Sequence, residues 1–139
     1  MQAVLLAGGK GTRLRPYTHV LPKPLMPLGE ADPMPIIEVV LRQLARFGFR
    51  EVTIITGYLT ELIETFCGDG SKFGTSLRYR REVKPLGTAG GLTLVERPAE
   101  PLLVINGDIL TTLDFGAMMA FHRQRAPAAT IASYPREVK

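Results

Sequence analysis

The sequence predicts an α/β fold in which helices are layered on a mainly parallel sheet. Strand-like and helix-like segments alternate along the chain, as they do in βαβ units. The first strand, at 3–6, is apolar at every position, which is typical of a strand covered on both faces. A glycine-rich bend at 8–11 follows it directly, where open α/β sheets bind their ligands. Together these observations predict a Rossmann-like three-layer sandwich.

The remaining elements follow from apolar spacing and from capping residues. Further strands are expected at 51–56, 76–81, 102–105 and 130–133, and helices at 35–47, 60–66, 88 to before Pro98, and 115–125. Pro35 suits the first turn of its helix, and Asp114 can cap the last helix. Asn106–Gly107 is a hairpin signal, but the segment 102–105 does not alternate. We therefore expect 102–105 to be a buried central strand.

Length and composition indicate one ordinary globular domain. The chain has 139 residues, 45% of them hydrophobic and 22% charged, with a formal net charge of +4. No apolar run approaches the ~20 residues of a membrane span, and no signal peptide is recognisable. One cysteine, Cys67, cannot form an internal disulfide and fits a reducing cytoplasm. Arg78, Arg80 and Arg81 lack the interleaved aromatics of a nucleic-acid platform, so a solvated edge strand is expected there.

The glycine bend predicts an anion site. Gly8, Gly9 and Gly11 leave the chain after the first strand almost without side chains, so that backbone N–H groups can approach a ligand. Lys10 and Arg13 stand beside them and suit the oxygens of a phosphate chain. The spacing matches neither a P-loop nor the dinucleotide fingerprint. The bend therefore belongs to another class of phosphate loop.

Three motifs extend this interpretation. They read LAGGKGTRLRPYTHVLPKPLMPL at 6–28, PLGTAGG at 85–91 and VINGD at 104–108. In this order they resemble the signature of the sugar-phosphate nucleotidyltransferases, also called nucleotide-sugar pyrophosphorylases, and most of all the mannose-1-phosphate guanylyltransferase type. The resemblance implies a glycosyltransferase-A-like nucleotidyltransferase fold of which residues 1–139 form the N-terminal, nucleotide-binding part. It also implies an enzyme that joins a nucleoside triphosphate to a sugar 1-phosphate, releasing pyrophosphate.

The same resemblance implies roles for individual residues. Arg13 and Lys23 are expected to act on the phosphates as catalytic residues. The nucleotide is expected to contact Leu6, Ala7, Gly8, Gly9, Gly11, Thr12, Gly87, Thr88, Ala89 and Gly90. Asp108 matches the family's metal-binding aspartate, and its carboxylate suits Mg²⁺. The expected ligands are thus a nucleoside triphosphate, a sugar 1-phosphate and Mg²⁺.

Several points stay open in the sequence. The acceptor can be another phosphorylated molecule such as phosphocholine, or the chain can be a non-catalytic regulatory module that binds nucleotide. Family members differ at 82–84, so the nucleobase is not readable. The family's domain is longer and places a second metal-binding aspartate after the point where this sequence stops. We therefore expect slow or no turnover by this chain alone, and an open sheet edge after Ser133 that favours a homo-oligomer.

Overall fold

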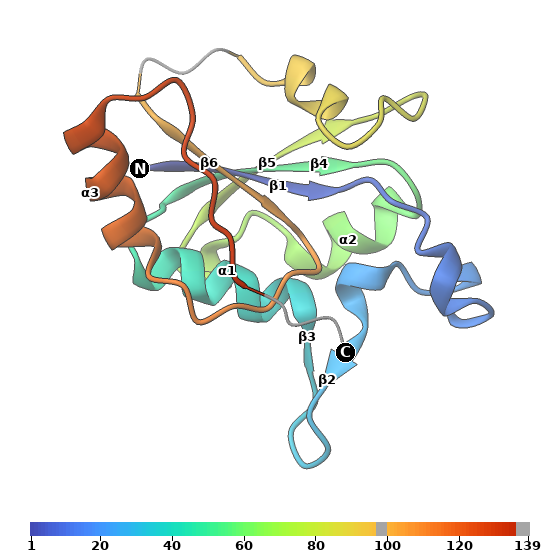
Figure 1. Ribbon diagram of the computed structural model, residues 1–139. Helices are drawn as coiled ribbons and strands as arrows, with labels where there is room; N and C mark the ends of the chain where they lie inside the picture. Colours follow the sequence, from blue (N-terminus) through green and yellow to red (C-terminus); the bar gives the residue numbers. More distant parts are fainter. Residues whose placement is uncertain (97–99, 136–139) are drawn as a thin grey trace.

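A four-stranded, fully parallel sheet forms the centre of the molecule (Figure 1). The computed structural model describes residues 1–96 and 100–135. The strands are β1 (Gln2–Ala7), β4 (Glu51–Thr56), β5 (Ser76–Arg81) and β6 (Leu102–Asn106), arranged in the order β5-β4-β1-β6. All four carboxyl ends therefore meet at one edge of the sheet, as the alternation of elements predicts.

Three α-helices and several short turns accompany the sheet. The helices are α1 (Ile36–Arg46), α2 (Thr60–Cys67) and α3 (Phe115–Arg125). Short 3₁₀ helices are η1 (Thr12–Leu14), η2 (Tyr17–His19), η3 (Lys23–Leu25), η4 (Ser71–Phe73) and η5 (Gly90–Leu94). A two-stranded antiparallel ribbon joins β2 (Pro27–Leu28) to β3 (Met34–Pro35) just before α1. Among the described residues, no helix has the length and apolar character needed to cross a membrane.

The apolar core lies between the sheet and α1. Alternate residues of β1, Ala3 and Leu5 among them, face this helix, and the buried stripe of α1 meets them with Ile37, Val40 and Leu44. Figure 1 shows α1 and α2 on the same side of the sheet, with α3 at the end of the sheet near the N-terminus. This layer holds the strands rigidly, so that the loops at their carboxyl ends are presented by a fixed scaffold.

The opposite face of the sheet is covered by the segment that carries η5. A Cβ added to Gly91 would lie 2.9 Å from Cγ2 of Ile55, so η5 rests directly on β4. Val4 and Ile55, which point to this face, are buried beneath the segment. The α/β prediction with a parallel sheet is thus confirmed, with a thinner layer on this side than on the other.

One sequence expectation for the elements is wrong, and another is met only in part. Residues 130–133 form no strand, and Ile131 is 86% exposed. The short helix expected after Thr88 is present as the five-residue 3₁₀ helix η5 rather than as an α-helix, because Gly90 and Gly91 are poor helix formers. The predicted end of that helix near Pro98 lies outside the described residues.

The place of β6 in the sheet also differs from expectation. The strand pairs in parallel with β1, which excludes the hairpin alternative at Asn106–Gly107. In the described part of the chain, however, β6 is an edge strand, not a central one, and Val104 is 40% exposed. The apolar run at 102–105 indicates that both faces of the strand can be covered by other parts of the protein. The position of the strand in the sheet depends on long-range pairing, which a local pattern does not encode.

Candidate functional site

A large cavity opens at the carboxyl ends of β1, β4 and β6. Its volume is about 870 Å³, and it is lined by residues from five separate segments of the sequence. The lining includes Leu6, Ala7, Gly8, Gly9, Lys10, Gly11, Thr12, Arg13, Lys23, Gly87, Thr88 and Asp108. Eleven of these twelve are predicted site residues, and Lys10 stands within the predicted bend. A smaller hollow of about 170 Å³ near the amino ends of the strands contains none of them.

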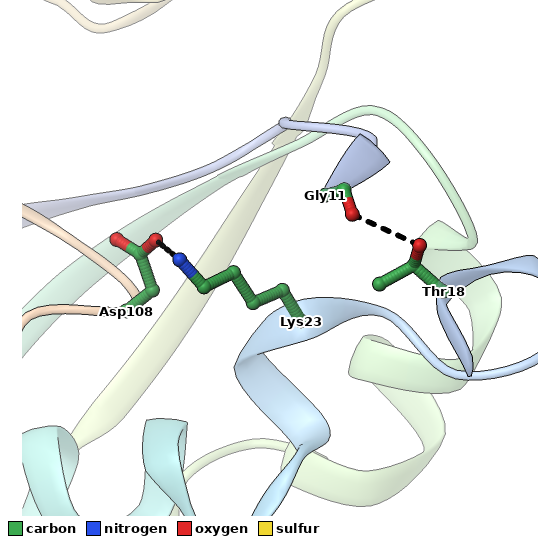
Figure 2. Close-up of polar contacts among 4 residues, drawn as sticks. All are labelled: Gly11, Thr18, Lys23 and Asp108. Atoms are coloured by element: carbon green, nitrogen blue, oxygen red, sulfur yellow. Dashed lines mark hydrogen bonds and ion pairs between the residues drawn. The ribbon is translucent and has the colours of Figure 1, made fainter. Parts of the chain in front are cut away.

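Close backbone packing sets the position of the glycine bend. A Cβ added to Gly57, in the loop after β4, would lie 2.9 Å from the carbonyl oxygen of Gly8. Gly11 adopts the left-handed conformation at φ 59°, and its carbonyl accepts a hydrogen bond of 3.0 Å from the Thr18 hydroxyl (Figure 2). A Cβ on Gly9 would meet nothing within 4 Å. The bend is thus fixed at Gly8 and Gly11 and open between them.

Lys23 reaches across the cavity from η3. Pro22 and Pro24 flank it, and Pro24 and Leu25 are buried, so the backbone that carries the side chain is anchored. Figure 2 shows the side chain extended toward Asp108, where Nζ lies 2.5 Å from Oδ2 of the carboxylate. The structure therefore joins two predicted site residues that stand 85 positions apart in the chain.

Asp108 stands just beyond the end of β6. The backbone N–H of Gly107 donates a 2.8 Å hydrogen bond to the carbonyl of Leu6, which holds the loop against β1. The Asp108 side chain is 33% exposed and belongs to the lining of the cavity. This position, at the tip of a strand beside the glycine bend, is the one that the sequence predicts.

The carboxylates that line the cavity, Asp108 and Glu82, determine what kind of metal site is feasible. Within residues 1–96 and 100–135, no three His, Cys, Asp or Glu side chains gather closely enough to hold a metal. Mg²⁺ keeps several waters and is commonly bound by one or two carboxylates together with substrate phosphates. Asp108, with the amide of Asn106 also lining the cavity, fits that mode of binding. The donor set fits a cation that arrives with a phosphate ligand rather than a closed protein cage.

Arg13 is, with Lys23, the second cationic residue that the sequence predicts to act on the phosphates. It lies on η1, is exposed, lines the cavity, and forms no ion pair with any described residue. A guanidinium in this position presents several N–H donors to an anion. Arg13 and the backbone of the bend together suit the oxygens of a polyphosphate.

The segment after β5 closes the cavity on the side of η5. Of the four residues expected to contact the nucleotide here, Gly87 and Thr88 belong to the lining of the cavity, whereas Ala89 and Gly90 do not. The sequence interpretation assigned no role to Glu82. Its carboxylate lies between two glycines, because a Cβ on Gly8 or Gly91 would come within 2.8 or 2.7 Å of its oxygens. The signal that could have identified Glu82 from the sequence is its position directly after the parallel strand β5.

Tyr58 and Asn106 also line the cavity without having been predicted. Each stands within two residues of the carboxyl end of β4 or β6. The general rule that ligands bind at these ends was again the signal that would have found them.

Comparisons with known proteins show the family and the fold of the chain. The family model described as nucleotidyl transferase matches residues 2–139. A UTP–glucose-1-phosphate uridylyltransferase of Synechocystis sp. is 36% identical over 94% of the chain, and a mannose-1-phosphate guanylyltransferase of Mycobacterium tuberculosis is 37% identical over 94%. A solved Bacillus anthracis structure, assigned as a glucose-1-phosphate thymidylyltransferase in complex with sucrose, superposes with a TM-score of 0.81 at 32% identity over 89% of the chain.

The chain belongs to the nucleotidyl transferase family. It spans 36% of the length of each of these two curated relatives and 50% of the Bacillus anthracis chain. The three names carry three different nucleobases, which agrees with the absence of a readable base signal in the sequence. The resemblance inferred from the three motifs is confirmed at the level of the family and of the fold.

Proposed function

We propose that residues 1–139 are the nucleotide-binding part of a sugar-1-phosphate nucleotidyltransferase. The reaction transfers a nucleotidyl group from a nucleoside triphosphate to a sugar 1-phosphate, giving a nucleotide sugar and pyrophosphate. One observation carries the proposal: the glycine bend, Arg13, Lys23 and Asp108 all line one cavity of about 870 Å³. Membership of the nucleotidyl transferase family supports the reaction class.

The proposed chemistry is an in-line displacement. A phosphate oxygen of the sugar 1-phosphate forms a bond to the α-phosphorus, while the bond from that phosphorus to the bridging oxygen breaks and pyrophosphate leaves. The protein aligns the reactants and offsets their negative charge. Backbone N–H groups of the bend bind phosphate oxygens, and Arg13 binds the departing phosphates with its planar fork.

Lys23 and Asp108 complete the proposed site. Lys23 reaches into the cavity from its anchored turn and supplies a second cation near the phosphates. Asp108 would hold Mg²⁺, which when bound neutralises charge on the phosphate oxygens. A cytoplasmic location belongs to the same proposal, because a single buried cysteine suits a reducing compartment. Among the described residues β6 is an edge strand, which leaves room for two copies to associate, and sedimentation would detect the association.

A thermal-shift panel tests the proposal. GTP, dTTP, UTP, CTP and ATP are each added with Mg²⁺, and the preferred triphosphate gives the largest rise in the unfolding temperature. At about 100 times the dissociation constant the ligand adds ~2.7 kcal/mol, on the order of 10 °C for a domain of this size. A pyrophosphate assay with sugar 1-phosphates then measures turnover. No shift with any triphosphate would refute the proposal.

A further inference from the structure

The Lys23–Asp108 pair places an ammonium where a metal ligand is proposed. Nζ of Lys23 lies 2.5 Å from Oδ2 of Asp108, a distance that no intervening ion or water can occupy. A divalent cation at the same oxygen would meet a positive charge at van der Waals distance. The two cations therefore compete for one carboxylate.

The ion pair between Lys23 and Asp108 can open at little cost in free energy. Its side chains are 38% and 33% exposed, so water screens the attraction, and ion pairs this accessible are worth about 0–1 kcal/mol. The anchor of Lys23 is rigid, whereas its four-carbon stem is flexible. A Cβ on Gly11 would lie 3.4 Å from Cβ of Lys23, so the stem rises beside the glycine bend while its tip contacts Asp108 (Figure 2). The same side chain can turn toward phosphates at the bend without movement of the backbone.

We propose that Lys23 is the resident counter-cation of Asp108 and that a divalent cation binds by displacing it. The displaced ammonium then moves to the phosphate oxygens that accompany the cation, so that both charges remain compensated. Divalent cation and triphosphate consequently strengthen each other's binding, and the cation alone binds weakly. This inference rests on the proposed function, because it gives Lys23 a second partner in the triphosphate.

The test measures Mn²⁺ binding without nucleotide, using the full 139-residue chain. The amplitude of the free Mn²⁺ signal in electron paramagnetic resonance gives the dissociation constant. Lys23→Met removes the competing charge and should tighten Mn²⁺ binding about fivefold, the factor that corresponds to the upper worth of an exposed ion pair. Lys23→Gln repeats the test with a polar side chain, in case the methionine disturbs the fold. Unchanged or weaker binding of Mn²⁺ by both folded variants would overturn the inference.

Three matched variants isolate the contact. Lys23→Arg keeps a cation at the site and should bind Mn²⁺ as the parent does. Lys10→Met removes the same charge from the same cavity but from a residue outside the pair, and should tighten binding less. Adding Asp108→Asn to Lys23→Met should abolish the gain in Mn²⁺ affinity. A gain in Mn²⁺ affinity that survives in the double variant would contradict the role of Asp108. Because no triphosphate is present, the outcome is independent of the nucleotide panel that tests the proposed function.

Discussion

At the scale of single residues, the contact between Gly8 and Gly57 fixes the geometry of the bend. A Cβ on Gly57 would come 2.9 Å from a backbone oxygen, which cannot rotate away as a side chain can. Gly57→Ala should therefore destabilise the fold by about 1–3 kcal/mol, as overpacking commonly does. Gly9→Ala is the matched control, because its Cβ would meet nothing within 4 Å. Chemical denaturation of both variants checks this, and equal stabilities would contradict it.

Cys67 gives the protein a pH-dependent stability. Burial raises the pKa of its thiol to about 12, whereas an unfolded thiol titrates near 8.5. As the pH rises from 8 to 10 the unfolded state loses this proton and the folded state keeps it, so the free energy of unfolding should fall. Burial also raises the pKa of the Tyr79 hydroxyl, which acts in the same direction at higher pH.

The contribution of Cys67 can be separated by comparing how steeply the free energy of unfolding changes with pH in two proteins. Urea denaturation at several pH values gives the change in unfolding free energy with pH for the parent and for Cys67→Ala. The variant should be less stable throughout, because the thiol is buried, but its stability should fall less steeply above pH 8. Parallel slopes would show that the thiol is not protected in the folded state.

At the scale of elements, substitutions at the two ends of α3 should change the stability of the fold in opposite directions. Oδ1 of Asp114 accepts a 2.8 Å hydrogen bond from the backbone N–H of Ala117, which confirms the predicted cap. Asp114→Ala should cost about 1 kcal/mol. Ala126, at the other end, holds a left-handed conformation at φ 46°, so Ala126→Gly should stabilise by up to about 1 kcal/mol. Thermal unfolding of the two variants should show midpoints displaced in opposite directions, and shifts of the same sign would be inconsistent with this view of α3.

The elements also show which parts of the fold can be predicted from the sequence. β1, α1, β4 and α2 agree with the expected segments to within one or two residues at each end, because strong apolar patterns define them. The expected strand at 130–133 is absent, since Ile131 is the one large apolar residue there and it faces solvent. Local propensity indicates an extended conformation but does not provide a partner strand.

At the scale of the whole molecule, the site was easier to predict than the contacts within it. Motifs at 6–28, 85–91 and 104–108 all reach one cavity, because parallel strands deliver their following loops to one edge. The pairing of Lys23 with Asp108 could not be inferred, since it depends on how two distant loops fold toward each other. The contacts of Glu82 could not be predicted for the same reason, because its neighbours Gly8 and Gly91 come from separate segments.

The measurement that tests the central claim most directly is a calorimetric titration with the triphosphate that the panel selects. Arg13→Ala should weaken its binding about 10- to 100-fold, because it removes charged hydrogen bonds to phosphate worth about 1.5–3 kcal/mol. Arg46→Ala, an exposed arginine at the end of α1 away from the cavity, should bind as the parent does. Equal affinity of the Arg13 variant and the parent would contradict a polyphosphate site at the glycine bend.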